Sequence, residues 1–305
     1  MDEACCDMNG AGDFADGTPL DADELYGKYL RKSSKFPHVW CAGCGIGIVL
    51  GSLIRAIDEL RLPKDDVLVV SGIGCSSRLP GYVDFNTLHT THGRALAFGT
   101  GAKMGRPSLN VIAVMGDGDA LAIGGNHFIH SCRRNINITA VVVNNFNYGM
   151  TGGQNSPTTP EGAVLSTAPH GNIENAFDTC DLALGSGATF VARSTVYHVT
   201  ETKEYIIRAV RNQGFSVVEV IAPCYTGYGR RNDAESAADM VAELGRKAVP
   251  FKKSAFITRQ KPSGGLEGGK FHIGVFRDER RPEFCESYAK LVRELRAKRE
   301  TPIPS

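Results

Sequence analysis

The stretch Val111-Ile-Ala-Val-Met-Gly-Asp-Gly-Asp119 decides the fold of this chain, together with its counterpart Ile138-Thr-Ala-Val-Val-Val-Asn-Asn145. Each begins with a short, continuous apolar run, which is typical of a parallel strand buried on both faces. Between them, Ala120 to Arg134 can form a crossover helix. The sequence therefore predicts one strand–helix–strand unit, in which both strands end with polar residues at the same edge of a sheet.

That edge carries an acid and an amide. Twenty-six residues separate Gly118 from Asn145, and open α/β sheets bind ligands at the carboxyl ends of their strands. Asp117 and Asn145 offer the oxygen ligands that Mg2+ prefers, usually beside a phosphate, and free backbone N–H groups at the helix start favour the same anion. The spacing resembles the thiamine diphosphate signature. The alternative is two ordinary turns whose Gly, Asp and Asn serve only turn geometry and N-capping.

The rest of the chain alternates in the same way. From about 36 to 223, helical and extended patterns follow one another, which predicts an α/β protein with a doubly wound, mainly parallel sheet flanked by helices. The expected helices are Gly45–Leu60, Arg94–Met104, Ile173–Leu184 and Glu201–Asn212, and the expected further strands are Val67–Ser71, Thr189–Ala192 and Ser216–Ile221. The stretch from Tyr148 to Asn172 has no period, and a loop of that length is usually functional.

Three segments are expected: a flexible N-terminal segment (1–22), a main domain (23–230) and a C-terminal extension (231–305) for contacts with a subunit or a partner protein. Helices are predicted at Ala234–Ala248 and Glu283–Lys298, with a glycine-rich stretch at Gly264–Gly269. The extension is locally basic. Its cations form either a solvated face or a docking surface for an acidic protein, and they are Lys252, Lys253, Lys261, Lys270, Arg277, Arg280 and Arg281.

Composition excludes several classes of protein. The chain has 305 residues, of which 42% are hydrophobic and 22% charged, and a net charge of +1; such a balance gives no general attraction to nucleic acid or membranes. We find no apolar run of 18 residues and no secretory leader. Nine cysteines, an odd number, do not form a disulfide scaffold in a chain of this length, which favours metal or redox chemistry in a reducing cytoplasm.

Four of the cysteines occupy telling positions. Cys41 and Cys44 form a CxxC, whereas Cys75 and Cys224 each follow a predicted strand and should emerge at the edge that carries Asp117. Four thiolates suit tetrahedral zinc or a [4Fe–4S] cluster. The spacing matches neither a zinc ribbon nor a compact ferredoxin, but a position beside an organic cofactor favours electron transfer. The remaining thiols of the globular part, Cys132, Cys180 and Cys285, are expected to be structural.

Several longer motifs carry a closer resemblance. WCAGCG (40–45), SGIGCSSRLP (71–80), HTTHGRALAFGTGAK (89–103), GDGDALAIGGNHFIHSCRRN (116–135), NNFNYGMTGGQNSPT (144–158) and IAPC (221–224) occur in this order. Together they resemble the beta subunit of 2-oxoacid:ferredoxin oxidoreductases over roughly residues 36 to 226. The resemblance implies that 23–230 is a thiamine diphosphate- and [4Fe–4S]-binding domain, active in the coenzyme A-dependent oxidative decarboxylation of a 2-oxoacid.

The resemblance also implies roles for individual residues. Cys41, Cys44, Cys75 and Cys224 would ligate the cluster, and Asp117, Asn145 and the Asn147 carbonyl would hold Mg2+. Arg78 would lie near the substrate, as a candidate for binding the distal carboxylate of 2-oxoglutarate, and His92 near the cofactor. The residues expected to line the diphosphate and thiazolium are Gly116, Gly118, Asp119, Tyr148, Gly149, Met150 and Thr151.

No motif here supplies the carboxylate that activates the cofactor's aminopyrimidine, and in this family a glutamate of the alpha subunit does so. The expectation is a chain inactive alone, in an α2β2 assembly whose alpha subunit also contributes contacts to coenzyme A, with ferredoxin as acceptor. The long C-terminal segment favours 2-oxoglutarate over pyruvate. Two rival hypotheses are a non-redox thiamine enzyme with structural zinc and an electron-transfer scaffold with a vestigial thiamine site.

Overall fold

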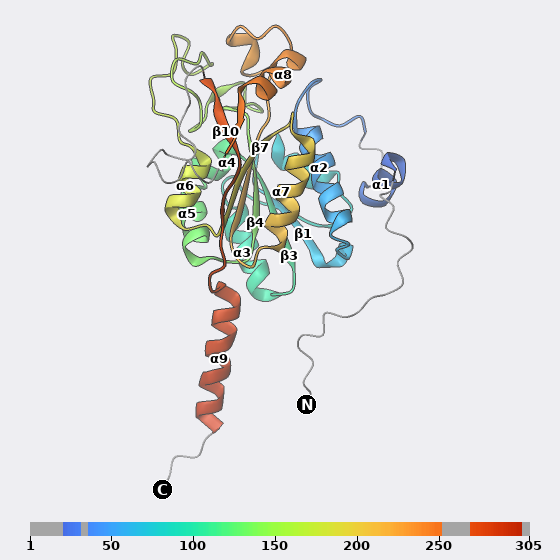
Figure 1. Ribbon diagram of the computed structural model, residues 1–305, viewed down its shortest axis with the longest axis vertical. Helices are drawn as coiled ribbons and strands as arrows, with labels where there is room; N and C mark the ends of the chain where they lie inside the picture. The colour runs from blue at the N-terminus through green and yellow to red at the C-terminus, as the bar shows by residue number, and fades with distance from the viewer. Residues whose placement is uncertain (1–20, 32–35, 252–268, 301–305) are drawn as a thin grey trace.

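The computed structural model describes residues 21–31, 36–251 and 269–300, which form one sheet between two layers of helices (Figure 1). The sheet has eight strands in the order β2-β1-β3-β4-β8-β7-β10-β9. The first six are mutually parallel, which confirms the predicted doubly wound sheet. In that order, the strands are Asn86–His89, Val67–Ser71, Asn110–Gly116, Thr139–Asn144, Ser216–Ile221, Phe190–Thr195, Phe271–Asp278 and Ala248–Pro250.

Alternate residues of each strand enter two separate apolar cores. Val67 and Val69 of β1 pack on one face of the sheet, and Leu68 and Val70 on the other. The first core is closed by α1 (Ala22–Tyr29), α2 (Ile46–Glu59) and α7 (Val199–Arg211), and the second by α3 (Ala95–Gly105), α5 (Gly125–Arg134) and α6 (Thr179–Ser186). Burial on both faces explains why these strands are continuous apolar runs.

The single crossover helix predicted for Ala120–Arg134 is wrong. The chain instead forms α4 (Asp117–Leu121), a break, and then α5. A Cβ at Gly124 would lie 2.2 Å from the Asp119 carbonyl oxygen and 3.2 Å from Gly93 Cα, so the backbone makes a close approach that a regular helix does not allow. The long helix whose start was expected to face an anion is therefore not formed, and α4 has only five residues.

A second helix is shorter than predicted. The pattern Ile173–Leu184 predicts a helix, but α6 begins at Thr179, where the Asp178 side chain accepts a hydrogen bond from the Asp181 N–H and caps the helix. Ile173 is 91% exposed. The apolar residues before Asp178 belong to the loop that precedes the helix, and hydrophobic spacing alone cannot distinguish the two.

The C-terminal part contains a strand that the sequence did not predict. After α8 (Ala237–Lys247) and β9, β10 pairs antiparallel with β7, and α9 (Phe284–Glu300) then projects from the body (Figure 1). The Arg277 guanidinium donates to the Leu184 and Ala188 carbonyls, so it anchors β10. Three of the basic residues, the predicted glycine-rich stretch up to residue 268 and the N-terminal segment up to residue 20 lie outside the described residues.

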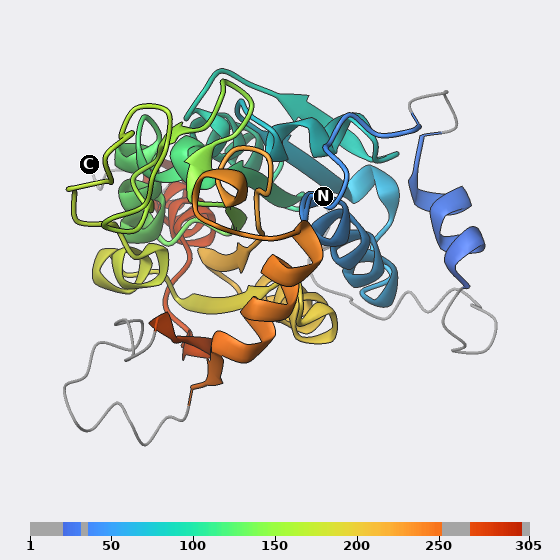
Figure 2. The same cartoon turned by 90° about the horizontal axis from the view of Figure 1, so that it is seen from above.

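The carboxyl ends of the parallel strands face the long loop predicted at Tyr148–Asn172. That loop contains only the two-residue strands β5 (Asn147–Tyr148) and β6 (Gln154–Asn155), which pair with each other. Seen from above, this loop and the segment around α8 lie over the end of the sheet (Figure 2). None of the described helices is both long and apolar enough to cross a bilayer.

Candidate functional site

A cavity of about 120 Å3 opens at the carboxyl edge of the sheet. It is formed where β1, β3 and β4 end, so residues far apart in sequence meet there because parallel strands share one edge. Most residues that the sequence singled out line it. The lining residues are Ile73, Gly74, Cys75, Ser76, His92, Gly116, Asp117, Gly118, Asp119, Asn145, Asn147, Tyr148, Gly149, Met150 and Thr151.

Asp117 is the buried acid of this cavity, with 2% of its surface exposed. Its Oδ2 accepts hydrogen bonds from Ser156 Oγ (2.5 Å) and Thr158 Oγ1 (2.6 Å). Burial raises the pKa of Asp117 to about 6, although the two hydroxyl groups oppose the shift. Sequence reasoning included Ser156 and Thr158 in a motif but gave them no role; a Ser-Pro-Thr in a loop that returns to the glycine-acid turn was the available signal.

The other oxygen of Asp117 faces a cluster of acceptors. One terminal atom of the Asn145 amide lies 3.2 Å from Asp117 Oδ1, 2.7 Å from the Asn147 carbonyl oxygen and 3.1 Å from Asn147 Oδ1. If this atom is the amide nitrogen, it donates to the neighbouring oxygens. If it is the amide oxygen, four oxygens lie close together, and a bound cation would offset their mutual repulsion. Neighbouring ligands of octahedral Mg2+ at ~2.1 Å are about 3 Å apart. The distances from this Asn145 atom to Asp117 Oδ1 and to the Asn147 carbonyl oxygen are close to that spacing.

Gly118 leaves room for an aromatic ring beside these oxygens. A Cβ at Gly118 would lie 2.1 Å from Cε1 of Tyr148, so a side chain is excluded here. Burial, followed by the negative charges of Asp117 and Asp119, raises the pKa of Tyr148. The ring therefore forms a neutral wall of the cavity.

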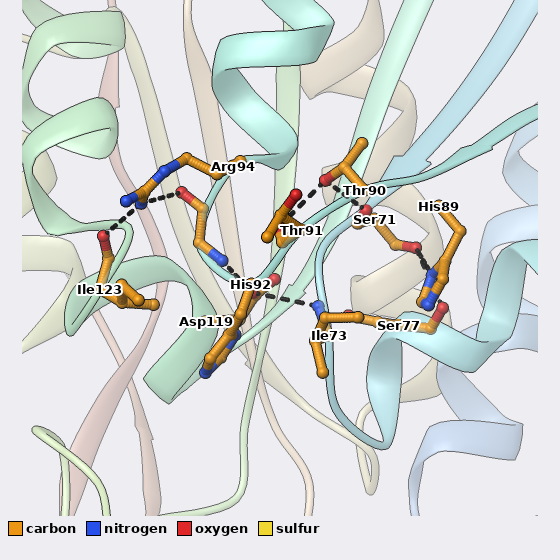
Figure 3. A network of polar contacts seen from close by, with 11 residues as sticks. Ser71, Ile73, Ser77, His89, Thr90, Thr91, His92, Arg94, Asp119 and Ile123 are labelled. Atoms are coloured by element: carbon orange, nitrogen blue, oxygen red, sulfur yellow. Dashed lines mark hydrogen bonds and ion pairs between the residues drawn. The ribbon is translucent and has the colours of Figure 1, made fainter.

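Asp119 organises the opposite wall (Figure 3). Its Oδ1 accepts hydrogen bonds from the Gly93 N–H (2.7 Å) and the Ile73 N–H (3.3 Å), and lies 2.7 Å from Nδ1 of His92. Its Oδ2 is buried and has no hydrogen-bond partner among the described residues. Asp119 thus holds the His92 ring at the cavity and keeps one oxygen unsatisfied.

His89, from the same sequence motif, lies apart from this wall. Its Nδ1 is 3.0 Å from Ser71 Oγ, on the edge strand β2 (Figure 3). His89 is not among the cavity-lining residues within the described chain. His89 and His92, three residues apart in sequence, therefore contact different residues.

The four thiols selected from the sequence gather near the cavity. Burial, followed by the charges of neighbouring thiols, raises the pKa of Cys44 and of Cys75 to about 11; Cys224 and Cys41 contribute to both shifts. A Cβ at Gly149 would lie 3.4 Å from Cys224 Sγ and 3.5 Å from Cys75 Sγ. Two loops of the cavity thus bring thiols together around a glycine, and ionising them requires a compensating cation.

The four thiols do not form a site for a single metal ion within the described chain. Among residues 21–31, 36–251 and 269–300, no three His, Cys, Asp or Glu side chains are placed to hold a metal ion. The Trp40 indole donates to the Cys75 carbonyl oxygen (2.7 Å), which ties the segment before the CxxC to the loop after β1. Four thiols that lie near one another fit a cluster of several metal ions, because each thiolate can bind a different ion of the cluster. Cys132, Cys180 and Cys285 are buried elsewhere, as predicted for structural thiols.

Arg78 lies beside the cavity rather than in its wall. It is exposed in a short 3-10 helix, Ser76–Gly81, and its charge opposes the rise in the pKa of Cys75. Within the described chain it is not one of the lining residues. The structure therefore places this cation close to the thiols and leaves its guanidinium open to a partner.

Comparisons with known proteins agree with this geometry. The family model for the thiamine pyrophosphate enzyme, C-terminal TPP binding domain, matches residues 41–220. The 2-oxoglutarate synthase subunit KorB of Methanocaldococcus jannaschii is 46% identical over 88% of this chain and 98% of its own length. The subunit of the same name from Archaeoglobus fulgidus is 51% identical over 87% of this chain and 94% of its own length.

A solved structure has the same fold. The 2-oxoglutarate:ferredoxin oxidoreductase from Magnetococcus marinus, with 2-oxoglutarate, coenzyme A and succinyl-CoA bound, matches with a TM-score of 0.78 at 31% identity. The match covers 91% of this chain and 96% of that chain. The chain therefore belongs to the thiamine pyrophosphate enzymes and, among them, to the beta (KorB) subunits of the 2-oxoacid:ferredoxin oxidoreductases.

Proposed function

We propose that this chain is the thiamine diphosphate- and [4Fe–4S]-binding subunit of an enzyme that acts on 2-oxoglutarate. The reaction converts 2-oxoglutarate and coenzyme A to succinyl-CoA and CO2 and releases one proton and two electrons. Ferredoxin accepts the electrons. The observation that carries this proposal is the meeting of two ligand sets at one cavity: the oxygens around Asn145 and the thiols around Gly149. The substrate follows from the names of the relatives.

The oxygen set would hold the cofactor's diphosphate through Mg2+. Asp117, Asn145 and the Asn147 carbonyl are the ligands, and Ser156 and Thr158 keep the Asp117 carboxylate in place. The cavity residues Gly118, Asp119, Tyr148, Met150 and Thr151 surround the cofactor. Bound thiamine diphosphate supplies the electron sink for decarboxylation.

The thiol set would hold the cluster. Cys41, Cys44, Cys75 and Cys224 are the ligands, and a cluster held there supplies one-electron acceptance next to the cofactor. The seven cysteines of the described chain are all free thiols, as expected in a reducing compartment, and we place the enzyme in the cytoplasm.

Two side chains act on the substrate in this proposal. Arg78 binds the distal carboxylate, since its exposed guanidinium can form a bidentate pair with it. His92 lines the cavity with Nδ1 held by Asp119, so its Nε2 is the ring nitrogen left to exchange a proton with a bound group. The alpha subunit supplies the glutamate that activates the cofactor and the contacts to coenzyme A, in an α2β2 assembly.

The test is an anaerobic analysis of the chain purified with its alpha subunit. We expect four irons, acid-labile sulfide and one thiamine diphosphate per chain, and reduction of a viologen dye faster with 2-oxoglutarate than with pyruvate. We expect Cys44→Ser to lose iron and dye reduction, and Cys285→Ser, a thiol buried away from the cavity, to keep both. The beta chain alone should give no turnover.

The other outcomes are equally informative. One zinc without iron would make the protein a non-redox thiamine enzyme, and iron without thiamine would make it an electron-transfer scaffold. Full activity of the lone chain would contradict the need for an alpha subunit. A preference for pyruvate would leave the enzyme class intact and reject the substrate.

The helix α9 is the part of the C-terminal extension that we propose to contact the alpha subunit. It begins at the amino edge of the sheet, where the Phe284 N–H donates to the Asn135 carbonyl and the Asn137 N–H donates to Glu283, the residue before the helix. This edge is opposite the one that carries the thiols, so the helix is unsuited to electron transfer. Tyr288, Leu291 and Leu295 are each about half exposed and form one apolar stripe. Phe284 and Cys285 pack against the second core, whereas the exposed stripe further along α9 would gain stability if a partner buried it.

We expect the double variant Leu291→Glu/Leu295→Glu to weaken binding of the alpha subunit roughly tenfold or more. Arg293→Gln, on the opposite side of α9 by helical geometry, is the control and should leave binding unchanged. Co-purification of tagged subunits and calorimetric titration measure the effect. Equal binding by wild type and the double variant would show that the stripe contacts something else.

A further inference from the structure

Asn147 contacts both ligand sets of the site. It is 3% exposed and lies in β5, directly after the turn that carries Asn145. Its carbonyl oxygen is 2.7 Å from the Asn145 amide, whereas its side-chain Nδ2 donates to Cys224 Sγ at 3.7 Å. One residue thus faces the oxygen ligands with its backbone and a thiol with its side chain.

A second N–H donor and a glycine beside Cys224 allow this contact. The Gly227 N–H also donates to Cys224 Sγ, at 3.3 Å. A Cβ at Gly227 would lie only 2.3 Å from Asn147 Nδ2, so glycine at this position leaves the amide room to reach the sulfur. Cys224 therefore accepts one N–H from its own loop and a second from the side chain of Asn147 in β5.

We propose that Asn147 is a positioning residue that raises the reduction potential of the [4Fe–4S] cluster through its N–H···S bond to Cys224. This inference depends on the proposed function, because it needs the cluster to be present. An N–H donor stabilises negative charge on a ligand sulfur, and the cluster carries one more negative charge after it accepts an electron. The bond is consequently stronger in the reduced state, which favours reduction.

The position of Asn147 also connects the N–H···S bond to the cofactor site. The same residue offers its carbonyl to the cation that holds the cofactor, so filling the cofactor site fixes the backbone from which the amide reaches Cys224. Each oxidative decarboxylation releases two electrons, and a cluster held by these thiols would supply one-electron acceptance for each of them. An amide that favours the reduced cluster therefore acts on both transfers.

The experiment is a potentiometric titration of the complete αβ enzyme, purified anaerobically, with dithionite as reductant and the cluster followed by electron paramagnetic resonance. We expect Asn147→Leu and Asn147→Ala to retain four irons per chain and to have lower midpoint potentials. At a fixed poise, the ratio of reduced to oxidised cluster should fall about threefold to tenfold, the worth of one hydrogen bond; tenfold corresponds to 59 mV for one electron.

The control is Asn155→Leu. Asn155 is the pairing partner of Asn147 in the β5–β6 hairpin, but its amide donates to Asn172 Oδ1 at 3.0 Å and not to a thiol. This variant disturbs the same hairpin and should leave the potential unchanged. The alanine variant at position 147 covers the case in which leucine is too large for the cluster to be retained.

The failures of the two proposals are distinguishable. Asn147 variants with full iron content and the wild-type potential would overturn this inference while leaving the proposed function intact. Equal shifts in the Asn147 and Asn155 variants would also overturn it, since a general effect of the hairpin would then explain the result. Wild-type enzyme without iron would overturn the proposed function itself.

Discussion

Replacement of Asp117 by alanine is expected to abolish retention of Mg2+ and thiamine diphosphate by the complex without destabilising the protein that lacks them. Asp117 Oδ1 lies 3.2 Å from the Asn145 amide. Loss of a residue that hydrogen-bonds to a metal ligand typically lowers the affinity for the metal about 10- to 100-fold. Loss of the ligand itself should therefore lower this affinity ~100-fold or more.

The expected effect on stability has the opposite sign. Burial raises the pKa of Asp117 to about 6 from an ordinary value of 3.8, so the folded state binds the proton more tightly than the unfolded state does. At pH 7, above both values, the ionised carboxylate therefore opposes folding unless a cation is present. Removing it relieves this cost, and the cofactor-free variant should be at least as stable as wild type.

Two measurements separate these effects. Calorimetric titration gives the affinity for thiamine diphosphate in the presence of Mg2+, and thermal unfolding gives the midpoint with and without the cofactor. Wild type should gain stability from the cofactor by mass action, and Asp117→Ala should not. Asp65→Ala, an exposed acid before β1, serves as the control. A cofactor-induced rise in the midpoint of the Asp117 variant would contradict the assignment of the ligand.

Replacement of Glu219 by leucine should destabilise the fold by about 3–5 kcal/mol, the usual cost of breaking a buried ion pair. Glu219 and Arg193 are 1% and 3% exposed, and Arg193 Nε lies 2.5 Å from Glu219 Oε2. Burial opposes ionisation of Glu219, but the charge of Arg193 and the hydrogen bonds from Arg193 and Asn144 together outweigh it and hold the pKa of Glu219 below its ordinary value. Leucine would leave a buried guanidinium with Asp178 as its one counter-ion among the residues that the structure describes.

The same variant should also weaken cofactor binding. Glu219 Oε1 accepts a hydrogen bond from Asn144 Nδ2 (2.8 Å). Asn144 Oδ1 lies 2.9 Å from Thr158 Oγ1, and this hydroxyl donates its proton to Asp117 Oδ2 at 2.6 Å. This chain of contacts connects the buried ion pair to the proposed Mg2+ ligand. Loss of Glu219 frees Asn144 to reorient, and the support of Asp117 is then weaker.

Denaturant-induced unfolding of the variant measures the stability change, and an exposed ion pair provides the matched control. The side chains of Arg208 and Asp278 are 39% and 45% exposed, and Arg208 Nη2 lies 2.6 Å from Asp278 Oδ2. Asp278→Ala should therefore lower the free energy of unfolding by less than about 1 kcal/mol. The double variant Arg193→Met/Glu219→Leu should recover part of the loss, because no buried guanidinium remains. A loss of under 1 kcal/mol in Glu219→Leu would show that the pair is not important for stability.

The sequence predicted the parallel strands β1, β3, β4, β7 and β8 because each is a short continuous run of mostly apolar residues, which can be recognised locally. Val67–Ser71 and Ser216–Ile221 were predicted with the same bounds that the structure shows. Three strands of the sheet, β2, β9 and β10, were not predicted. Strand β10 has a mixed burial pattern and pairs antiparallel with β7, so it lacks the continuous apolar run. Its pairing with β7 is a contact between distant segments, which no local pattern encodes.

Sequence alone determined which residues reach the carboxyl edge of the sheet. Asp117, Asn145 and Cys75 each follow a strand, and strand direction then places them at one edge whatever the details of packing. Only the tertiary structure decided which atoms meet there: the hydroxyls of Ser156 and Thr158 on Asp117, the amide of Asn147 on Cys224, and the separation of His92 from His89. Periodicity fixes the face or edge on which a side chain lies, whereas hydrogen-bond partners depend on how separate loops pack against one another.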